Sequence, residues 1–142
     1  MGQALVETIA QLEQWTAEAG FSGPSYYNLV VTEGRSVAAV RYVSDPKVEP
    51  QSLYYSTGGK YQCSPAGVCS FGECDVSDKT IIIASERLTP NREDWFRVAP
   101  NHVLTVEPDL TVNVELMDVA RIGSRLSEQP NIARERAPIL VT

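Results

Sequence analysis

Apolar residues recur at helical spacing near the start of the chain. The positions that share one side of a helix are Leu5, Ile9, Leu12 and Trp15. Gly20 follows, where a left-handed residue ends many helices. The pattern predicts an amphipathic helix of about four turns whose apolar stripe faces the core. A helix that binds a partner is the functional alternative, and a core stripe is the commoner use of this pattern.

Short runs rich in β-branched and aromatic residues follow, separated by turn residues. Residues 26–32 and 36–43 flank Glu33-Gly34 and predict a β-hairpin. Residues 53–56 predict a short strand, and residues 95–98 form another short apolar run. Residues 102–107 and 110–116 predict two strands around Pro108-Asp109. In the last of these, apolar and polar residues alternate, which indicates one wet face.

The longest uninterrupted apolar strand pattern is Ile81, Ile82, Ile83 and Ala84. A continuous apolar run predicts a central strand covered on both faces. Ser85 and Glu86 follow at once, so they are candidate substrate-binding residues at a strand end. Residues in such a place more often satisfy backbone groups or solvent.

Two polar residues interrupt the predicted hairpin strands. Asn28 lies inside an apolar run, so its amide needs partners. We expect it to bridge backbone groups, and a ligand contact is the alternative. Arg41 is expected to pair with a carboxylate at the sheet surface, rather than to clamp an anion.

Residues 60–78 contain Gly and Pro breakers and little periodicity, so they predict a long loop. Cys63, Cys69 and Cys74 lie in this stretch. An odd number of cysteines suits a disulfide framework poorly, and their spacing does not match zinc sites. We expect plain thiols in a reducing, cytoplasmic compartment and no bound metal or cofactor. His102, the single histidine, is a candidate general base by residue type alone.

The 142 residues suit one domain with a sizeable core. A net charge of −6 argues against nucleic acid and anionic membranes as partners, and no apolar run is long enough to span a membrane. One helix followed by strands predicts an α+β fold with a mostly antiparallel sheet. One helix covers a sheet only partly, so we expect a partner, a dimer or a missing half of the domain to complete the cover.

Several blocks in this order resemble one family: residues 28–42, 52–56 and 83–89, then Asp94-Trp95 and Val98 with Asn101. They are similar to the later half of class II glutamine amidotransferase domains. The most similar group is the fungal glutathione-degrading amidotransferases and their bacterial ergothioneine-pathway relatives. The resemblance runs from about Ala4 to Leu116 and predicts a domain portion at residues 1–116. Residues 117–142 form a tail that we expect to be loosely ordered.

The resemblance implies a four-layer αββα sandwich of the N-terminal nucleophile hydrolase type. It implies hydrolysis of glutamine or of a γ-glutamyl bond through a thioester on an N-terminal cysteine, whose α-amine acts as base. Backbone and Asn donors form the oxyanion hole in this family. For the fungal members it also implies a peptidase-like partner in glutathione breakdown.

Gly2 occupies the position where the family has its cysteine, and the three cysteines of this chain are internal. The Arg, Asn-Gly and Asp motifs that bind glutamine in the family have no match here, so no catalytic residue is carried over. The chain is therefore expected to be part of a γ-glutamyl amidohydrolase that is inactive alone. One alternative is a free-standing interaction module derived from the fold. Another is an enzyme that uses Ser85 with His102, for which the sequence shows neither an orienting carboxylate nor an oxyanion hole.

Overall fold

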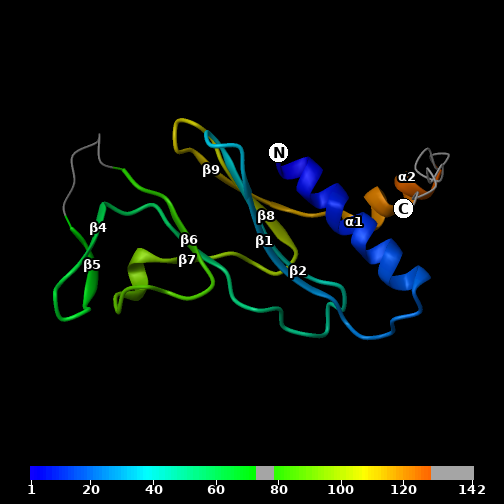
Figure 1. Cartoon of the computed structure of the whole chain (residues 1–142), viewed down its shortest axis with the longest axis horizontal. Helices are drawn as coiled ribbons and strands as arrows, with labels where there is room; N and C mark the ends of the chain where they lie inside the picture. The colour runs from blue at the N-terminus through cyan, green and yellow to red at the C-terminus, as the bar shows by residue number, and fades with distance from the viewer. Residues whose placement is uncertain (73–78, 129–142) are drawn as a thin grey trace, which may run out of the picture.

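The computed structural model describes residues 1–72 and 79–128 (Figure 1). Both α-helices lie beside a four-stranded sheet, and a three-stranded sheet lies on its other side. A two-stranded hairpin stands at the far end of the molecule from the helices. Every strand pair in these sheets is antiparallel. The predicted α+β class and its mostly antiparallel pairing are confirmed.

Helix α1 (Gly2–Glu18) confirms the amphipathic pattern. Its buried residues are Leu5, Val6, Ile9 and Ala10, all in the first part of the helix. Gly20 has φ of 77°, and its N–H donates to the carbonyl of Ala17, so it ends the helix as predicted. The prediction was wrong for Trp15, which is 57% exposed because the end of the helix extends past the core.

The four-stranded sheet has the order β1-β2-β8-β9. Its strands are β1 (Tyr26–Thr32), β2 (Val37–Val43), β8 (His102–Val106) and β9 (Val112–Leu116). Both predicted hairpins, β1 with β2 and β8 with β9, are confirmed. The alternation predicted for β9 is present, but Val114 and Leu116 are exposed because β9 is an edge strand.

Side chains on the two faces of this sheet enter two separate apolar clusters. On the helix side, Ala38, Val40 and Val103 pack with α1, and partly buried Val119 and Ile122 of helix α2 (Val119–Glu128) pack against them. On the other side, Ala39 and Leu104 pack with Leu53, Val98 and partly buried residues of the three-stranded sheet. The sheet therefore has apolar cover on both faces at its centre.

The three-stranded sheet has the order β6-β3-β7, with β3 (Tyr54–Ser56) in the middle. β6 (Ile82–Ala84) and β7 (Phe96–Arg97) lie at its edges, and the short 3₁₀ helix η2 (Arg92–Asp94) precedes β7. The prediction of a central strand at 81–84 was wrong, because β6 is an edge strand and is only partly buried. β2 is instead the most buried strand. The sequence did not indicate its burial, because β2 contains the charged residue Arg41.

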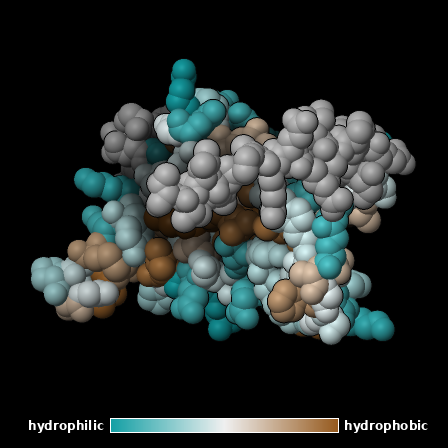
Figure 2. All heavy atoms as spheres, turned by 45° about the vertical axis from the view of Figure 1, so that its right-hand side comes forward, coloured by the Kyte–Doolittle hydropathy of each residue, from teal (hydrophilic) through white to brown (hydrophobic). Residues whose placement is uncertain are grey.

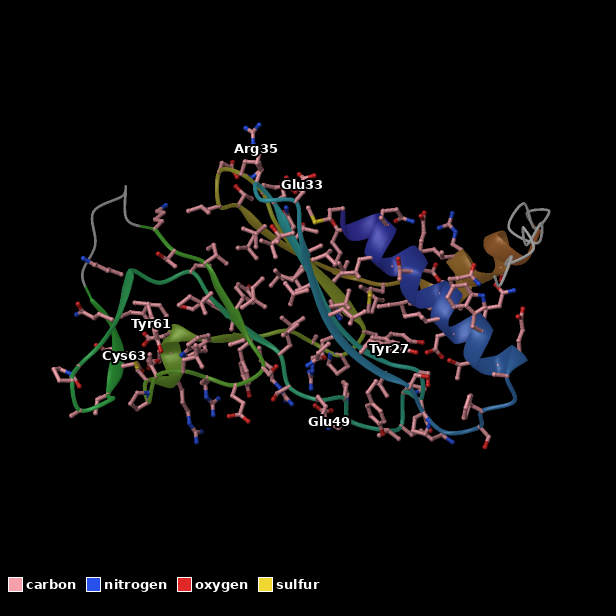
Figure 3. All side chains as sticks on the ribbon, in the orientation of Figure 1. Tyr27, Glu33, Arg35, Glu49, Tyr61 and Cys63 are labelled. Carbon is pink, nitrogen blue, oxygen red and sulfur yellow. A yellow bond between two sulfur atoms is a disulfide. The ribbon has the colours of Figure 1, made fainter. Side chains whose placement is uncertain are left out.

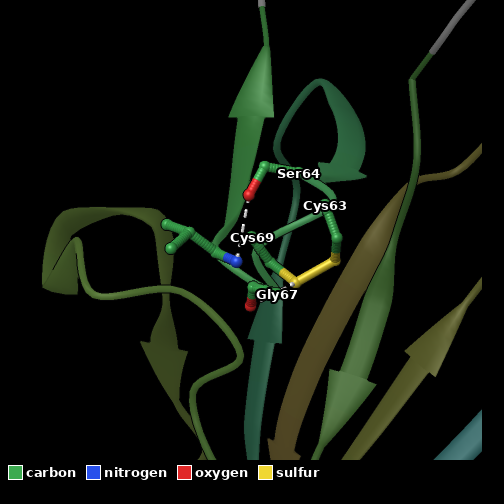
Figure 4. Close-up of a disulfide and its surroundings, with 5 residues drawn as sticks. Cys63, Ser64, Gly67 and Cys69 are labelled. Atoms are coloured by element: carbon green, nitrogen blue, oxygen red, sulfur yellow. Dashed lines mark hydrogen bonds between the residues drawn. A yellow bond between two sulfur atoms is a disulfide. The ribbon is translucent and has the colours of Figure 1, made fainter.

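The stretch predicted as a long loop contains a hairpin instead. β4 (Lys60–Cys63) pairs with β5 (Cys69–Gly72), and a disulfide joins Cys63 to Cys69 across the pair (Figure 4). The turn is closed by hydrogen bonds from the Ser64 N–H to the Val68 carbonyl and from the Gly67 N–H to the Ser64 carbonyl. The expectation of plain thiols was wrong for these two residues, because antiparallel pairing places them directly opposite each other. Cys74 lies outside the described residues.

Residues that were expected to belong to a loose tail include ordered structure. Met117 is buried in the helix-side cluster, and helix α2 packs against α1. Asp118 accepts a hydrogen bond from the Arg121 N–H through its Oδ1 atom, which caps the start of α2. Residues 129–142 lie outside the described part of the chain. Helix, sheet and sheet thus make three of the layers of the expected αββα sandwich.

Candidate functional site

Two of the three candidate binding residues, Asn28 and Ser85, bond to Ser52, and the third, Glu86, lines a depression beside it. Asn28 Nδ2 donates to the Ser52 carbonyl at 2.8 Å, and Ser52 Oγ donates to the Ser85 carbonyl at 2.8 Å. Asn28 lies on β1 of the large sheet, whereas Ser85 follows β6 of the small sheet. The favoured interpretation of Asn28 as a bridge to backbone is confirmed. We call this group, completed by Tyr54, Glu86 and Arg87, the Ser52 junction.

The Ser52 junction borders an open depression of about 290 Å³ lined by Ser52, Tyr54, Glu86 and Arg87. The Arg87 guanidinium carbon lies 5.2 Å from the centre of the Tyr54 ring, which is cation–π distance. Within the described chain neither Glu86 nor Arg87 forms a salt bridge. Both charges are therefore available at the rim of the depression, next to a fixed hydroxyl.

Arg41 holds the loop that carries Ser52. Its side chain is fully buried, and the guanidinium donates to the carbonyls of Gln51 at 2.8 Å, Val98 at 2.8 Å and Pro50 at 3.0 Å. It also donates to Glu49 Oε1 at 2.6 Å. The expected pairing with a carboxylate is confirmed, but its expected place at the sheet surface was wrong. Arg41 instead joins the two sheets from inside.

Glu49 completes this arrangement at the protein surface, on the loop between β2 and β3 (Figure 3). Its carboxylate also accepts from Arg97 Nη2 at 2.7 Å. The hydrogen bond from Arg41 and the positive charges of Arg41 and Arg97 lower the pKa of Glu49. Sequence reasoning missed Glu49 and Ser52, and the one signal for them was the arginine inside an apolar strand.

A second polar group fixes the turn between β6 and β7. Trp95 is buried, and its indole N–H donates to Thr89 Oγ1 at 2.8 Å. Thr89 Oγ1 donates to Asp94 Oδ2 at 3.2 Å, and Asn91 Nδ2 donates to Asp94 Oδ1 at 2.9 Å. Since all of these donors and acceptors are satisfied by each other, the group holds the turn in shape rather than presenting chemistry.

The residues of the proposed Ser–His pair are not brought together. Ser85 belongs to the Ser52 junction, and no hydrogen bond joins it to His102, whose Nδ1 lies 2.8 Å from the Pro100 carbonyl. Among the residues that the structure describes, no group of three His, Cys, Asp or Glu side chains is arranged to hold a metal ion.

Gly2 has a structural position in α1, on the helix side of the large sheet. A Cβ atom added there would lie 2.8 Å from Cγ2 of Thr105, so the helix packs closely on β8 through this residue. Gly2 also borders an open cleft of about 480 Å³ between α1, β8, β9 and α2. Asn28 points to the opposite face of the sheet, as its register with Arg41 shows. Gly2 is thus separated from the Ser52 junction by the sheet itself.

None of the helices in the described part of the chain is long and apolar enough to cross a membrane. No protein-family model matches the sequence. The sequence is 33% identical over 109 residues to the probable glutamine amidotransferase DUG3 of Saccharomyces cerevisiae, which covers 74% of this chain and 30% of that protein. The fold matches a glutamine aminotransferase class-II domain protein from Silicibacter pomeroyi with a TM-score of 0.59 and 21% identity.

That structural match covers 82% of this chain and 43% of the solved chain. The chain therefore spans less than half the length of each of these two relatives. The matched lengths agree with a domain of which this chain holds only a part. In fold the chain is part of a class II glutamine amidotransferase-like domain, and its sequence is related to that of DUG3.

Proposed function

We propose that this chain is the later part of an amidohydrolase that cleaves glutamine or a γ-glutamyl peptide such as glutathione. The observation that carries the proposal is the 33% identity to DUG3 over 109 residues. The two-sheet fold shared with the class II domain supports it. In the proposed reaction a cysteine thiolate attacks the γ-carbonyl, the C–N bond breaks to release ammonia or the amine of the peptide, and water then hydrolyses the thioester to glutamate and the free thiol.

The nucleophile in this proposal comes from residues outside this chain. Cys63 and Cys69 are internal to the chain, so neither has the free α-amine that acts as base in this mechanism. Gly2 lies within a helix on the side of the sheet away from the Ser52 junction. The chain contributes two sheets and the Ser52 junction, which would form the floor beneath the reacting groups.

Assay of the purified chain tests this proposal. Release of glutamate from glutamine and from γ-glutamyl peptides is measured for the chain alone and for the full-length protein of its source. We expect activity only in the full-length protein. Glutamate release by the chain alone would contradict the proposed source of the nucleophile.

The proposed setting of the whole enzyme is the cytoplasm, beside a peptidase-like subunit that would process the product. Fractionation of the source cells tests this placement, and we expect the protein in the cytoplasmic fraction. Recovery of the protein from the membrane or secreted fraction would contradict it.

A non-catalytic interaction module is the second candidate, and exposed apolar side chains favour it. Phe21 is 74% exposed, Leu116 is 71% exposed and Phe96 is 50% exposed. Figure 2 shows apolar residues reaching the surface between hydrophilic ones. A module that works alone would bind its partner without any hydrolase segment, whereas a chain that sediments as a monomer and binds no hydrophobic dye would count against it.

A further inference from the structure

The two larger sheets share a feature at their edges: each has one edge strand without charge and one that carries a charge. An edge strand presents unpaired backbone groups, and proteins usually protect such strands with charges, prolines or short length. Strands that lack these devices and remain exposed are suited to pairing with another polypeptide.

β1 is the unprotected edge of the large sheet. Its seven residues contain neither charge nor proline, and β2 is the strand that pairs with it in the described chain. Val30 is 54% exposed and Val31 is 39% exposed, although they point to opposite faces. In the described chain, the outer edge of β1 therefore has no strand to accept its hydrogen bonds, and its exposed valines have few neighbouring side chains on either face.

β6 is the corresponding edge of the small sheet. Ile82, Ile83 and Ala84 are uncharged and only partly buried, and β3 is the strand that pairs with them. Ile83 packs against the cluster around Ala39 and Leu104, so the strand is held in place from one side. Its other edge is open in the described chain.

The opposite edges carry charged residues, which protect them. β9 contains Glu115, and β7 contains Arg97. Along one row across the large sheet, the register runs Val30, Ala39, Leu104, Val114. Ala39 and Leu104 are fully buried, whereas Val30 and Val114 at the two ends are exposed. Val30 and Val114 are therefore comparable exposed positions for substitution, one on each edge strand of the large sheet.

We infer that β1 and β6 are the edges where a completing polypeptide adds strands, one to each sheet, and that this polypeptide is the remaining part of an amidotransferase domain. The inference rests on the proposed function. It is supported by the solved relative, of which the match leaves more than half outside. A second copy of this chain would offer only the same two edges. Pairing of β1 with β1 would leave both β6 strands without a partner, and pairing of β6 with β6 would leave both β1 strands without one.

The test uses the full 142-residue chain and one probe, the recombinant part of DUG3 that lies outside the matched region. As a positive control, the same probe is titrated with the segment of DUG3 that matches this chain. Binding in that control shows that the probe is folded and able to bind. Affinity is measured by titration, and amide hydrogen exchange locates the contact. We expect exchange in Tyr26–Thr32 and Ile82–Ala84 to slow at least roughly tenfold on binding, with little change in β7 and β9.

Two variants at the ends of the same row sharpen the test. Val30→Lys places a charge on the inferred docking edge, and Val114→Lys places the same charge at the protected edge. Both sites are exposed, so both variants should fold. We expect Val30→Lys to weaken probe binding about tenfold or more and Val114→Lys to change it less than about twofold.

The outcomes separate the docking inference from the proposed activity. Failure of the probe to bind, equal effects of the two variants, slowed exchange at β7 and β9 instead, or a homodimer formed through β1 would overturn the docking inference. Binding that slows exchange at β1 and β6 without glutamate release from glutamine would uphold the docking and contradict the proposed hydrolase. Glutamate release with slowed exchange in strands other than β1 and β6 would support the proposed hydrolase and contradict the docking inference.

Discussion

Replacing Arg41 by methionine tests whether this residue holds the two sheets and the Ser52 junction together. Methionine keeps an unbranched apolar stem but is shorter than arginine and has no donors. The carbonyls of Gln51, Pro50 and Val98 would lose their guanidinium partner, and Glu49 would lose the closer of its two arginines. The guanidinium is fully buried, so water does not readily replace these bonds.

The size of the effect follows from these contacts. A hydrogen bond to a charged group contributes about 1.5–3 kcal/mol, and breaking a buried ion pair typically costs about 3–5 kcal/mol. The methionine side chain restores some apolar burial, so we expect Arg41→Met to lower the free energy of unfolding by about 3 kcal/mol. Domains have about 5–15 kcal/mol in total, so this loss is large.

Urea unfolding of the whole chain measures this loss. With a denaturant slope of about 1–3 kcal/mol per molar urea, the midpoint should fall by roughly 1–3 M. Arg97→Met is the matched control, because Arg97 binds the same Glu49 but is 53% exposed. A surface arginine should change stability by no more than about 0.5 kcal/mol. Equal midpoints for the two variants would refute the role given to Arg41.

Three further predictions concern other parts of the chain. Burial, with Glu13 and Tyr27 nearby, raises the pKa of Tyr42 to about 12. The free energy of unfolding should therefore fall by at most roughly 3 kcal/mol as the pH rises from about 10 to about 12. The urea midpoints at pH 8 and pH 11 should differ less in Tyr42→Phe than in the unchanged chain. Reducing the Cys63–Cys69 disulfide should speed amide exchange in the β4–β5 hairpin, with a local loss of about 2 kcal/mol, and leave the large sheet unchanged. Thr89→Val should lower the free energy of unfolding by about 1–3 kcal/mol in urea because the buried indole N–H of Trp95 loses its acceptor, and no loss would contradict the role given to Thr89.

The direction of the Tyr42 effect follows from proton binding. Above pH 10 the unfolded chain releases the phenol proton, whereas the folded chain retains it until about pH 12. The unfolded state therefore binds fewer protons in this range, and stability decreases with rising pH. Below pH 10 both states are protonated, and the contribution of Tyr42 does not change.

Local patterns predicted the elements whose partners are close in sequence. The helix stripe, its Gly20 end and the two hairpins of the large sheet all follow from residues within one turn or one hairpin. The pairing of Asn28 with backbone was also predictable, because a buried amide needs partners. The helix and hairpin contacts lie near the residues that signal them, whereas the partner of Asn28 is Ser52, 24 residues away, and its identity was not predicted.

The errors concern contacts between distant parts of the chain. Three isoleucines in a row suggested a covered central strand, but periodicity does not show whether a strand has neighbours on both edges. Arg41 suggested a surface position, because its burial depends on Gln51 and on Val98, 57 residues away in sequence. The disulfide was missed because an odd count of cysteines hid a pair that the β4–β5 register brings together.

The central claim is that this chain works as the later part of an amidohydrolase whose nucleophile lies outside it. Native mass spectrometry of the protein from its source tests this most directly. We predict a particle heavier than the 15.6 kDa of this chain, containing a further polypeptide segment that begins with cysteine. A native particle of 15.6 kDa, with no segment attached or associated, would contradict the claim.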